Sequence, residues 1–164
     1  TSHGAYKFNR KSDGDILAMH VVEAIHARLP DIHLVMHGSS SVPQDLQEVF
    51  NAAGGEMRET WGVPVEEIVR GIRHGVRKVN IDTDCRLAMA GQIRKVAQAN
   101  KSEFDLRKFL KPAMDALAAL CRTRFEEFGT AGQASKIKVM PMAEMARLYR
   151  AGKLDPRIAT ARAA

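Results

Sequence analysis

Polar residues that could bind a phosphate group or a metal ion gather in three short segments of the sequence. They are residues 1–7 (TSHGAYK), residues 37–43 (HGSSSVP) and residues 80–84 (NIDTD). The second and third segments directly follow short apolar runs that we expect to be strands. Ligands bind at the carboxyl ends of parallel strands in α/β folds, so these segments are expected to contribute to one site.

Two of the segments contain a His-Gly pair, at His3-Gly4 and at His37-Gly38. A histidine at a strand end can project its imidazole into a cleft, and two such residues could share a metal ion that acts as a Lewis acid on a carbonyl. The spacing alone leaves metal ligation and packing open for both. Packing is expected for the other histidines, which fall in predicted helices or at a strand start: His20, His26, His33 and His74.

The serines after His37 favour an anion site. Residues 38–40 offer backbone N–H groups and hydroxyls just before a predicted helix, where the helix dipole also favours an anion. Asn80, Asp82 and Thr83 add an amide, a carboxylate and a hydroxyl after the next strand. Ordinary helix capping is the alternative role for the serines.

Apolar periodicity predicts the elements that position these segments. Helical spacing predicts helices over residues 15–29, 44–53, 65–74, 86–98, 106–120 and 142–151, and short apolar runs predict strands over residues 34–36 and 76–81. The alternation of strands and helices predicts an α/β fold with a parallel sheet. Two strands are few for a sheet that needs cover on both faces, so we expect part of a larger domain.

Composition and charge exclude several classes of protein. The 164 residues are 45% hydrophobic and 27% charged, which excludes collagen-like, disordered and disulfide-scaffold chains. No apolar run approaches the length of a membrane span, about 18 residues. The two cysteines, Cys85 and Cys121, indicate a reducing compartment or a packing role.

The net charge of +6 fits a protein that binds nucleic acid or an anionic substrate. Because the basic residues are scattered and only 5% of residues are aromatic, phosphate contacts are the better interpretation.

The segments TSHGAYK, HGSSSVP and GVRKVNIDTD closely resemble those of the class II, metal-dependent fructose-1,6-bisphosphate aldolases. FLKPA and FGTAGQASKIK resemble the same family's C-terminal region, especially in bacterial Calvin-cycle enzymes. The resemblance implies that residues 1–164 are the C-terminal part of a single (β/α)8 TIM-barrel domain whose N-terminal portion is absent. The two predicted strands would be the seventh and eighth of that barrel.

The resemblance also implies roles for individual residues. His3 and His37 would bind a catalytic Zn²⁺ or another divalent ion, with a monovalent cation as a possible second ion. Arg86 would reach toward the second phosphate of the substrate. Arg107 would extend across a subunit interface and bind substrate in the neighbouring subunit. The full set of implied substrate-binding residues is Gly4, Lys7, Gly38, Ser39, Ser40, Asn80, Asp82, Thr83, Arg86 and Arg107.

The activity that the resemblance implies is reversible aldol cleavage of fructose 1,6-bisphosphate to dihydroxyacetone phosphate and glyceraldehyde 3-phosphate. It serves glycolysis, gluconeogenesis or the Calvin cycle. The third metal ligand and the Asp that acts as acid and base are expected upstream of Thr1, so the isolated chain is expected to be inactive. A cytoplasmic homodimer or larger oligomer is expected, with no nucleic-acid or membrane partner. Tagatose-bisphosphate aldolase and an inactive fragment are the alternatives.

Overall fold

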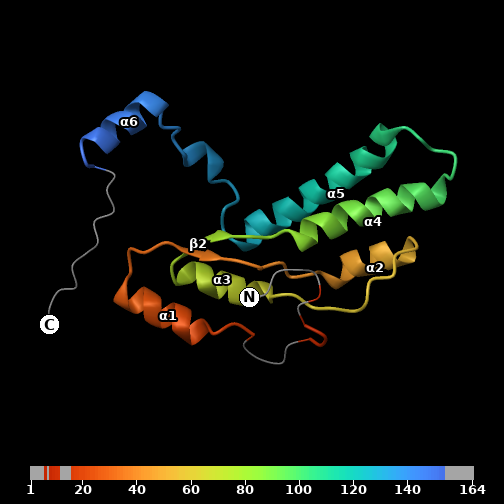
Figure 1. The fold of residues 1–164 in the computed structure, drawn as a ribbon, viewed down its shortest axis with the longest axis horizontal. Helices are drawn as coiled ribbons and strands as arrows, with labels where there is room; N and C mark the ends of the chain where they lie inside the picture. The colour runs from red at the N-terminus through yellow and green to blue at the C-terminus, as the bar shows by residue number, and fades with distance from the viewer. Residues whose placement is uncertain (1–5, 7, 12–15, 154–164) are drawn as a thin grey trace. The chain divides into compact units, whose positions relative to one another are not determined.

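The computed structural model describes residues 6, 8–11 and 16–153 of the chain, which divides into two units, residues 1–131 and 132–164. In the second unit, a short 3-10 helix, Ala134–Lys136, precedes α6 (Met142–Arg150). The described part of the first unit contains, in chain order, α1 (Met19–Arg28), β1 (Leu34–Met36), α2 (Gln44–Ala52), α3 (Val65–Arg73), β2 (Val76–Val79), α4 (Thr83–Ala99) and α5 (Leu106–Glu127) (Figure 1).

The two strands pair in parallel, as the alternation of elements predicts. Leu34 lies opposite Val76 and Met36 opposite Val79, with an irregularity after Leu34. β2 ends at Val79 rather than at residue 81, because the chain turns there into α4. The pairing nevertheless continues one residue further, since the backbone N–H of Asn80 donates to the carbonyl of Met36 at 2.9 Å. The described part of the chain is therefore α/β, with a two-stranded parallel sheet.

The core lies between this sheet and α3. Its buried residues are Met36, Val63, Ile68 and Val76. Gly71 on α3 makes the close approach possible, since a Cβ at this position would lie 2.7 Å from the Met36 Cε atom. Burial of these apolar side chains holds the helix against the strand that follows it.

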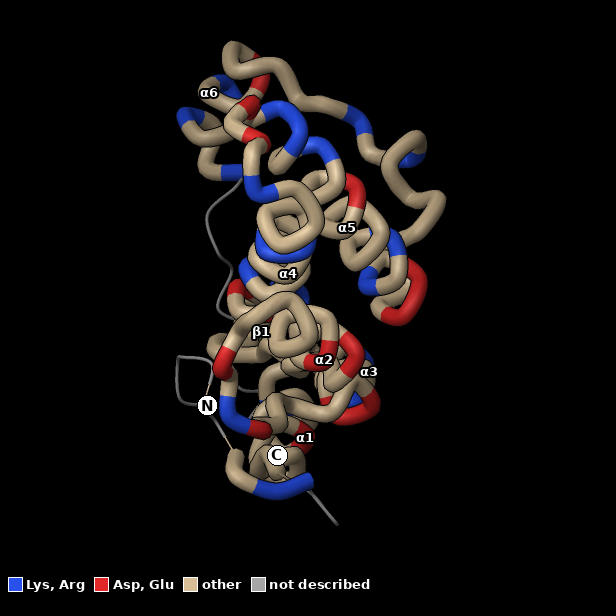
Figure 2. The backbone as a smooth tube through the Cα atoms, turned by 90° about the vertical axis from the view of Figure 1, so that its right-hand side faces the viewer, with Lys and Arg blue, Asp and Glu red and all other residues tan. Residues whose placement is uncertain are grey.

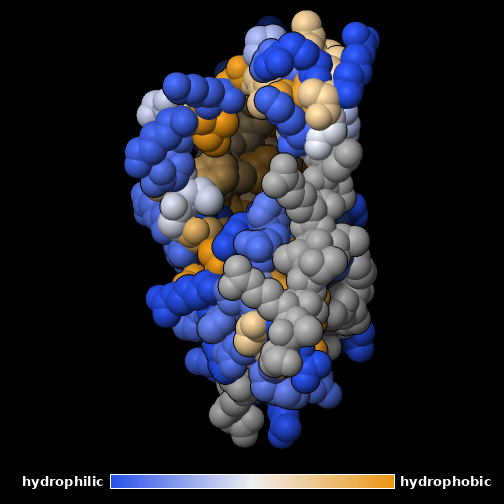
Figure 3. Space-filling model, turned by 90° about the vertical axis from the view of Figure 1, so that its left-hand side faces the viewer, coloured by the Kyte–Doolittle hydropathy of each residue, from blue (hydrophilic) through white to orange (hydrophobic). Residues whose placement is uncertain are grey.

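The opposite face of the sheet is less covered by the residues that the structure describes. Val35 of β1 keeps 46% of its surface exposed. Figure 3 shows apolar side chains at the surface among hydrophilic ones. Parallel sheets are normally covered on both faces, so this open face is the part of the first unit that departs from a complete α/β layer structure.

α4 packs against both α2 and α5. α4 and α5 run in opposite directions as a helical hairpin (Figure 1). Gly91 of α4 faces Val49 and Phe50 of α2, where an added Cβ would lie 3.2 Å from Val49 Cγ1. α5 extends to Glu127, beyond the predicted end at residue 120, and its buried side chains include Ala113 and Arg124. An apolar pattern does not predict this extension, because the side chain that is buried in the last turns is the charged Arg124.

The helix predicted over residues 15–29 begins only at Met19. The reason is a buried carboxylate of α3 that binds the preceding backbone: the N–H groups of Ile16 and Leu17 donate to the two carboxylate oxygens of Glu67, at 2.7 and 2.8 Å. Glu67 is only 8% exposed. This interaction joins segments that are about fifty residues apart in the sequence.

Lys and Arg residues occur on several elements and do not gather on one of them (Figure 2). This distribution agrees with the scatter of basic residues in the sequence. None of the helices among the described residues combines the length and the apolar character that crossing a membrane requires.

Replacing Glu67 by Gln is expected to lower the free energy of unfolding of the chain by about 1.5 to 3 kcal/mol, because an amide can accept only one of the two N–H bonds and has lost its charge. Urea unfolding followed by circular dichroism measures this change. Glu66→Gln, at the exposed neighbouring position, is the matched control and should leave stability nearly unchanged. Equal losses in the two variants would contradict the anchoring role of Glu67.

Candidate functional site

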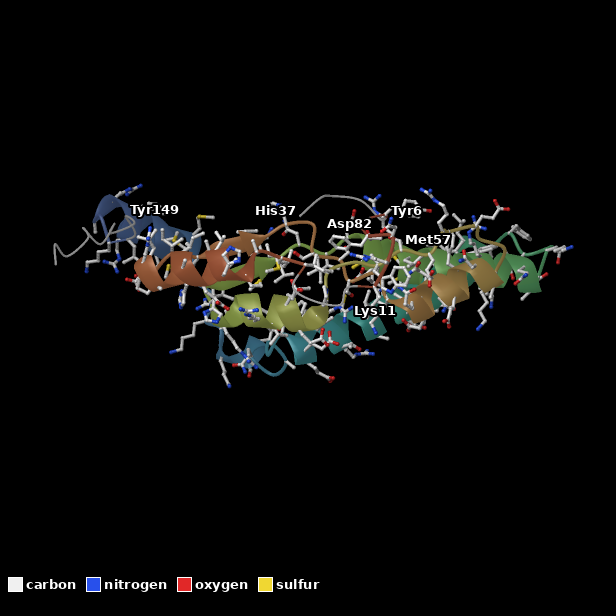
Figure 4. The ribbon with its side chains drawn as sticks, turned by 90° about the horizontal axis from the view of Figure 1, so that it is seen from below. Tyr6, Lys11, His37, Met57, Asp82 and Tyr149 are labelled. Carbon is white, nitrogen blue, oxygen red and sulfur yellow. The ribbon has the colours of Figure 1, made fainter. Side chains whose placement is uncertain are left out.

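The carboxyl ends of β1 and β2 bring the second and third polar segments together. The N–H of Ser39 donates to the carbonyl of Asn80 at 3.0 Å, next to the bond between Asn80 and Met36. Figure 4 shows His37 and Asp82 on the same side of the ribbon. The structure thus joins residues 37–41 and 80–84 in one candidate site, although they lie about forty positions apart in the sequence.

His37 is exposed and its ring contacts Asn80. The Nδ1 atom of His37 lies 2.9 Å from Nδ2 of Asn80, and Nζ of Lys78 donates to Oδ1 of Asn80 at 2.7 Å. Because an ammonium group can only donate, the Asn80 oxygen faces Lys78 and its NH₂ group faces the imidazole. In this arrangement Nδ1 of His37 accepts a hydrogen bond, and its neutral ring carries the proton on Nε2. A metal ion on Nδ1 would take the place of that amide donor.

Ser39 and Ser40 of the loop are buried, and their hydroxyl groups form hydrogen bonds within the protein. The Ser40 hydroxyl oxygen accepts from the N–H groups of Asp82 and Thr83, at 3.1 and 3.0 Å. The Ser39 hydroxyl donates to the carbonyl of His37 at 3.2 Å. The capping role that the sequence leaves open, for the helix after Pro43, is not observed, because the N-cap of α2 is Pro43 and makes no side-chain hydrogen bond. Ser40 instead binds the backbone at the start of α4. This contact explains why α4 begins at Thr83, three residues before the predicted start.

Arg86 lies one turn into α4, next to the strand ends. Its Nε atom donates to Oδ1 of Asp82 at 2.8 Å, and both side chains are largely exposed. An exposed pair of this kind adds little stability, so both charged groups remain accessible to solvent. A cavity of about 270 Å³ beside them is lined by Phe50, Met57, Asp82, Thr83, Arg86 and Leu87, with Ala90.

Arg107 lies apart from the other candidate residues that the structure describes. It lies in the first turn of α5, at the end of the α4–α5 hairpin that is remote from β2 (Figure 1). Its guanidinium binds the Asp105 carboxylate in a two-pronged ion pair, with Nη2 2.7 Å from Oδ2. This hydrogen bond lowers the pKa of Asp105 and raises that of Arg107. The side chain of Arg107 is 89% exposed.

Most of the first polar segment lies outside the residues that the structure describes. His3, Gly4 and Lys7 are among the residues that are not described. The chain just after it is anchored near the site. Phe8 pairs with Trp61 through two backbone hydrogen bonds of 3.2 and 3.0 Å. Gly62 and Val63, which follow Trp61, donate their N–H groups to the carbonyls of Ser41 and Ser40. One loop therefore joins residue 8 to the second polar segment.

The described residues contain no group of three His, Cys, Asp or Glu side chains arranged to hold a metal ion. His37 fits a metal site as one ligand, since its imidazole is exposed at a strand end and supplies a nitrogen donor. Further ligands would have to come from outside the described residues, where His3 lies.

One residue of the site has a role that the sequence does not predict. Asp84, in the first turn of α4, is fully buried, and its carboxylate accepts from the N–H of Ser41 at 3.0 Å and from that of Val42 at 2.8 Å. Its place within NIDTD draws attention to it, but no local pattern indicates which backbone it binds.

Ser40→Ala is expected to destabilise the chain by about 1 to 3 kcal/mol, because it leaves the N–H groups of Asp82 and Thr83 without their acceptor. Urea unfolding measures the change. Ser102→Ala removes a hydroxyl that is exposed and bonded locally to Asn100, so it should have a small effect. If the two variants lose the same stability, Ser40 does not cap α4.

Comparison with known proteins agrees with the resemblance of the motifs. Residues 1–133 match the family described as fructose-bisphosphate aldolase class-II. The fructose-bisphosphate aldolase of Sinorhizobium medicae (strain WSM419) is 71% identical over 164 residues, which are 100% of this chain and 46% of that protein. Fructose-bisphosphate aldolase 2 of Cereibacter sphaeroides is 69% identical over 97% of this chain and 45% of that protein.

The agreement extends to a more distant relative. The fructose-bisphosphate aldolase of Pseudomonas aeruginosa is 56% identical over 96% of this chain and 45% of its own length. The chain spans about half the length of the curated relatives it matches. The family match covers most of the 164 residues, and on this ground the chain belongs to the class-II fructose-bisphosphate aldolase family.

Proposed function

We propose that the protein that contains this chain catalyses metal-dependent aldol cleavage of fructose 1,6-bisphosphate, and the reverse condensation. The products of cleavage would be dihydroxyacetone phosphate and glyceraldehyde 3-phosphate. The observation that carries the proposal is the family match over residues 1–133, which includes all three polar segments. The meeting of His37 and Asn80 at the carboxyl ends of two parallel strands supports it, because this is the edge at which α/β barrels bind substrates.

The proposal includes a (β/α)8 barrel, of which β1 and β2 would be the seventh and eighth strands. Their parallel pairing and the packing of α3 against the core support this assignment. The exposed side chain of Val35 supports it as well, since further barrel strands and their side chains would cover that face of the sheet. In this proposal residues 1–164 are the C-terminal portion of a single domain.

His3 and His37 are the proposed metal ligands of this chain, and His37 meets the requirement for an accessible nitrogen donor. A divalent ion, zinc in this proposal, supplies Lewis-acid stabilisation of the negative charge that develops on the substrate's carbonyl oxygen. The Asp that moves the proton is proposed to lie in the rest of the protein. No lysine of this chain is proposed to form a Schiff base.

The remaining site residues are proposed to bind the two phosphate groups. Gly4, Lys7 and residues 38–40 would bind the dihydroxyacetone phosphate end, together with the polar residues after β2. The start of α4 supports this role, because a helix N-terminus attracts an anion. Arg86 would bind the second phosphate with its largely exposed guanidinium.

A homodimer or larger oligomer in the cytoplasm is also proposed, with Arg107 lent to a neighbouring subunit. The place of Arg107 in the first turn of α5, at the end of the α4–α5 hairpin away from β2, supports this assignment (Figure 1). Free Cys85 and Cys121 are consistent with a reducing compartment. Assignment to a Calvin-cycle enzyme rests on the resemblance of FLKPA and FGTAGQASKIK alone.

A hybrid enzyme tests the proposal. The matched stretch of the Sinorhizobium medicae protein is exchanged for this chain, and cleavage of fructose 1,6-bisphosphate is measured with and without a chelator. The hybrid is expected to be active and to lose activity with its metal. His37→Gln should lower kcat/KM by more than about 100-fold, beyond the loss typical of a residue that only orients a ligand, and should lower the bound zinc.

His33→Gln is the matched control, because His33 is an exposed histidine just before β1 whereas His37 lies just after it. It should leave both activity and metal content unchanged. The 164-residue chain by itself is expected to show no cleavage. A chelator-resistant hybrid, or activity in the isolated chain, would contradict the proposal, and a higher kcat/KM for tagatose 1,6-bisphosphate would change the assigned substrate.

A further inference from the structure

The loop after β1 is held by a carboxylate that no motif points to. Asp84 is fully buried, and it accepts three hydrogen bonds from two consecutive residues. Its Oδ2 atom accepts from the N–H and the hydroxyl of Ser41, both at 3.0 Å, and its Oδ1 atom accepts from the N–H of Val42 at 2.8 Å. A buried carboxylate is tolerated only when hydrogen bonds and an opposite charge compensate for lost hydration.

The opposite charge comes from Arg124, in the last turn of α5. Its Nη2 atom lies 3.5 Å from Oδ2 of Asp84 and donates to the Ser41 hydroxyl at 2.5 Å. Its Nη1 atom donates to Oε2 of Glu127 at 2.5 Å. Only 11% of the Arg124 side chain is exposed. The guanidinium therefore connects the end of α5 to a loop 83 positions earlier in the sequence.

The loop needs such support because its backbone is strained. Val42 has a φ of 51°, and it is the one non-glycine residue with positive φ in the described ranges. A β-branched residue adopts this conformation only where the surroundings enforce it. Asp84 binds the Val42 N–H, and the Val42 side chain is 1% exposed. Hydrogen bonding and burial together enforce the conformation.

The strained residue is directly linked to the candidate site. The carbonyls of Ser40 and Ser41 accept from Val63 and Gly62, at 3.0 and 3.1 Å. A Cβ on Gly62 would lie 2.1 Å from the Ser40 carbonyl oxygen, so the two backbones touch. A shift at Ser41 would therefore move Ser40, which caps α4 at Asp82 and Thr83.

We infer that Arg124, acting through Ser41 and Asp84, is a positioning residue for the phosphate-binding loop of this enzyme. Its hydrogen bonds and ion pairs among the described residues are to Ser41, Asp84 and Glu127, and the proposed function assigns none of these to substrate or metal. It holds residues 38–42 in the strained conformation that aligns the end of β1 with the start of α4. The inference rests on the proposed function for its kinetic consequence.

One further feature agrees with a specialised role. The Nε atom of Arg124 is buried without a hydrogen-bond partner among the described residues. Such a group is costly and rare in native proteins. An arginine suits this position because its Nη1 and Nη2 atoms bind Glu127 and Ser41 at the same time. A lysine has a single charged nitrogen and could not reproduce both contacts.

Kinetics of the hybrid enzyme test the inference. Arg124→Met is expected to raise KM for fructose 1,6-bisphosphate, and the inhibition constant of inorganic phosphate, by about 10- to 100-fold, because small displacements of binding groups have effects of this size. Arg124→Lys should give a smaller increase. Lys111→Met is the matched control, since it removes an exposed ion pair with Asp115 from the same helix and should change neither constant.

Hydrogen exchange gives a readout that does not depend on activity. In the hybrid enzyme, Arg124→Met should speed exchange of the Ser41 and Val42 amides at least tenfold, and Lys111→Met should not. If Arg124→Met does not fold, the same comparison is made with Arg124→Lys. An unmodified hybrid that is inactive would refute the proposed function. An active hybrid whose Arg124 variants keep KM, phosphate inhibition and amide protection unchanged would overturn the inference.

Discussion

The parallel pairing of β1 and β2 is the constraint on which the site depends. Because the ladder continues through the N–H of Asn80 to Met36, and then through the N–H of Ser39 to Asn80, the two loops leave the sheet side by side. The crossover through α3 keeps the strands parallel, and the buried contact of Ile68 with Met36 and Val76 holds that helix in place. Without this register, His37 and Asn80 would not meet.

Two buried carboxylates repeat one structural solution. Glu67 and Asp84 each lie in the first turn of a helix, α3 and α4, and each accepts N–H groups from two consecutive residues of an earlier loop. A negative charge at a helix N-terminus is favoured by the helix dipole, which offsets part of the cost of burial. The first turns of α3 and α4 thereby fix the positions of two loops that come earlier in the chain.

Local patterns predict those parts of the fold that local interactions determine. The helices that start at Gln44, Val65 and Met142 agree with prediction to within one residue, and the strands begin at Leu34 and Val76, as predicted. The starts of α1 and α4 differ from prediction because of residues that are distant in sequence. Glu67 binds the backbone just before α1, and Ser40 binds the N–H groups of Asp82 and Thr83 at the start of α4. Likewise, the strand-end rule predicts that residues 37–41 and 80–84 converge. No periodic pattern indicates that Arg124 reaches Ser41.

In the barrel that we propose, the loops after two neighbouring strands can form part of a binding site. β1 and β2 pair with each other, and the loops that follow them are held by contacts within this chain, as those of Ser40 and Asp84 illustrate. A metal site is different, because its ligands must converge from several strand ends around the barrel axis. His37, just after β1, is the ligand that we propose from this strand end. The proposed assignment of the proton-transferring Asp to the rest of the protein agrees with this geometry, because the described residues supply the loops of only two strand ends.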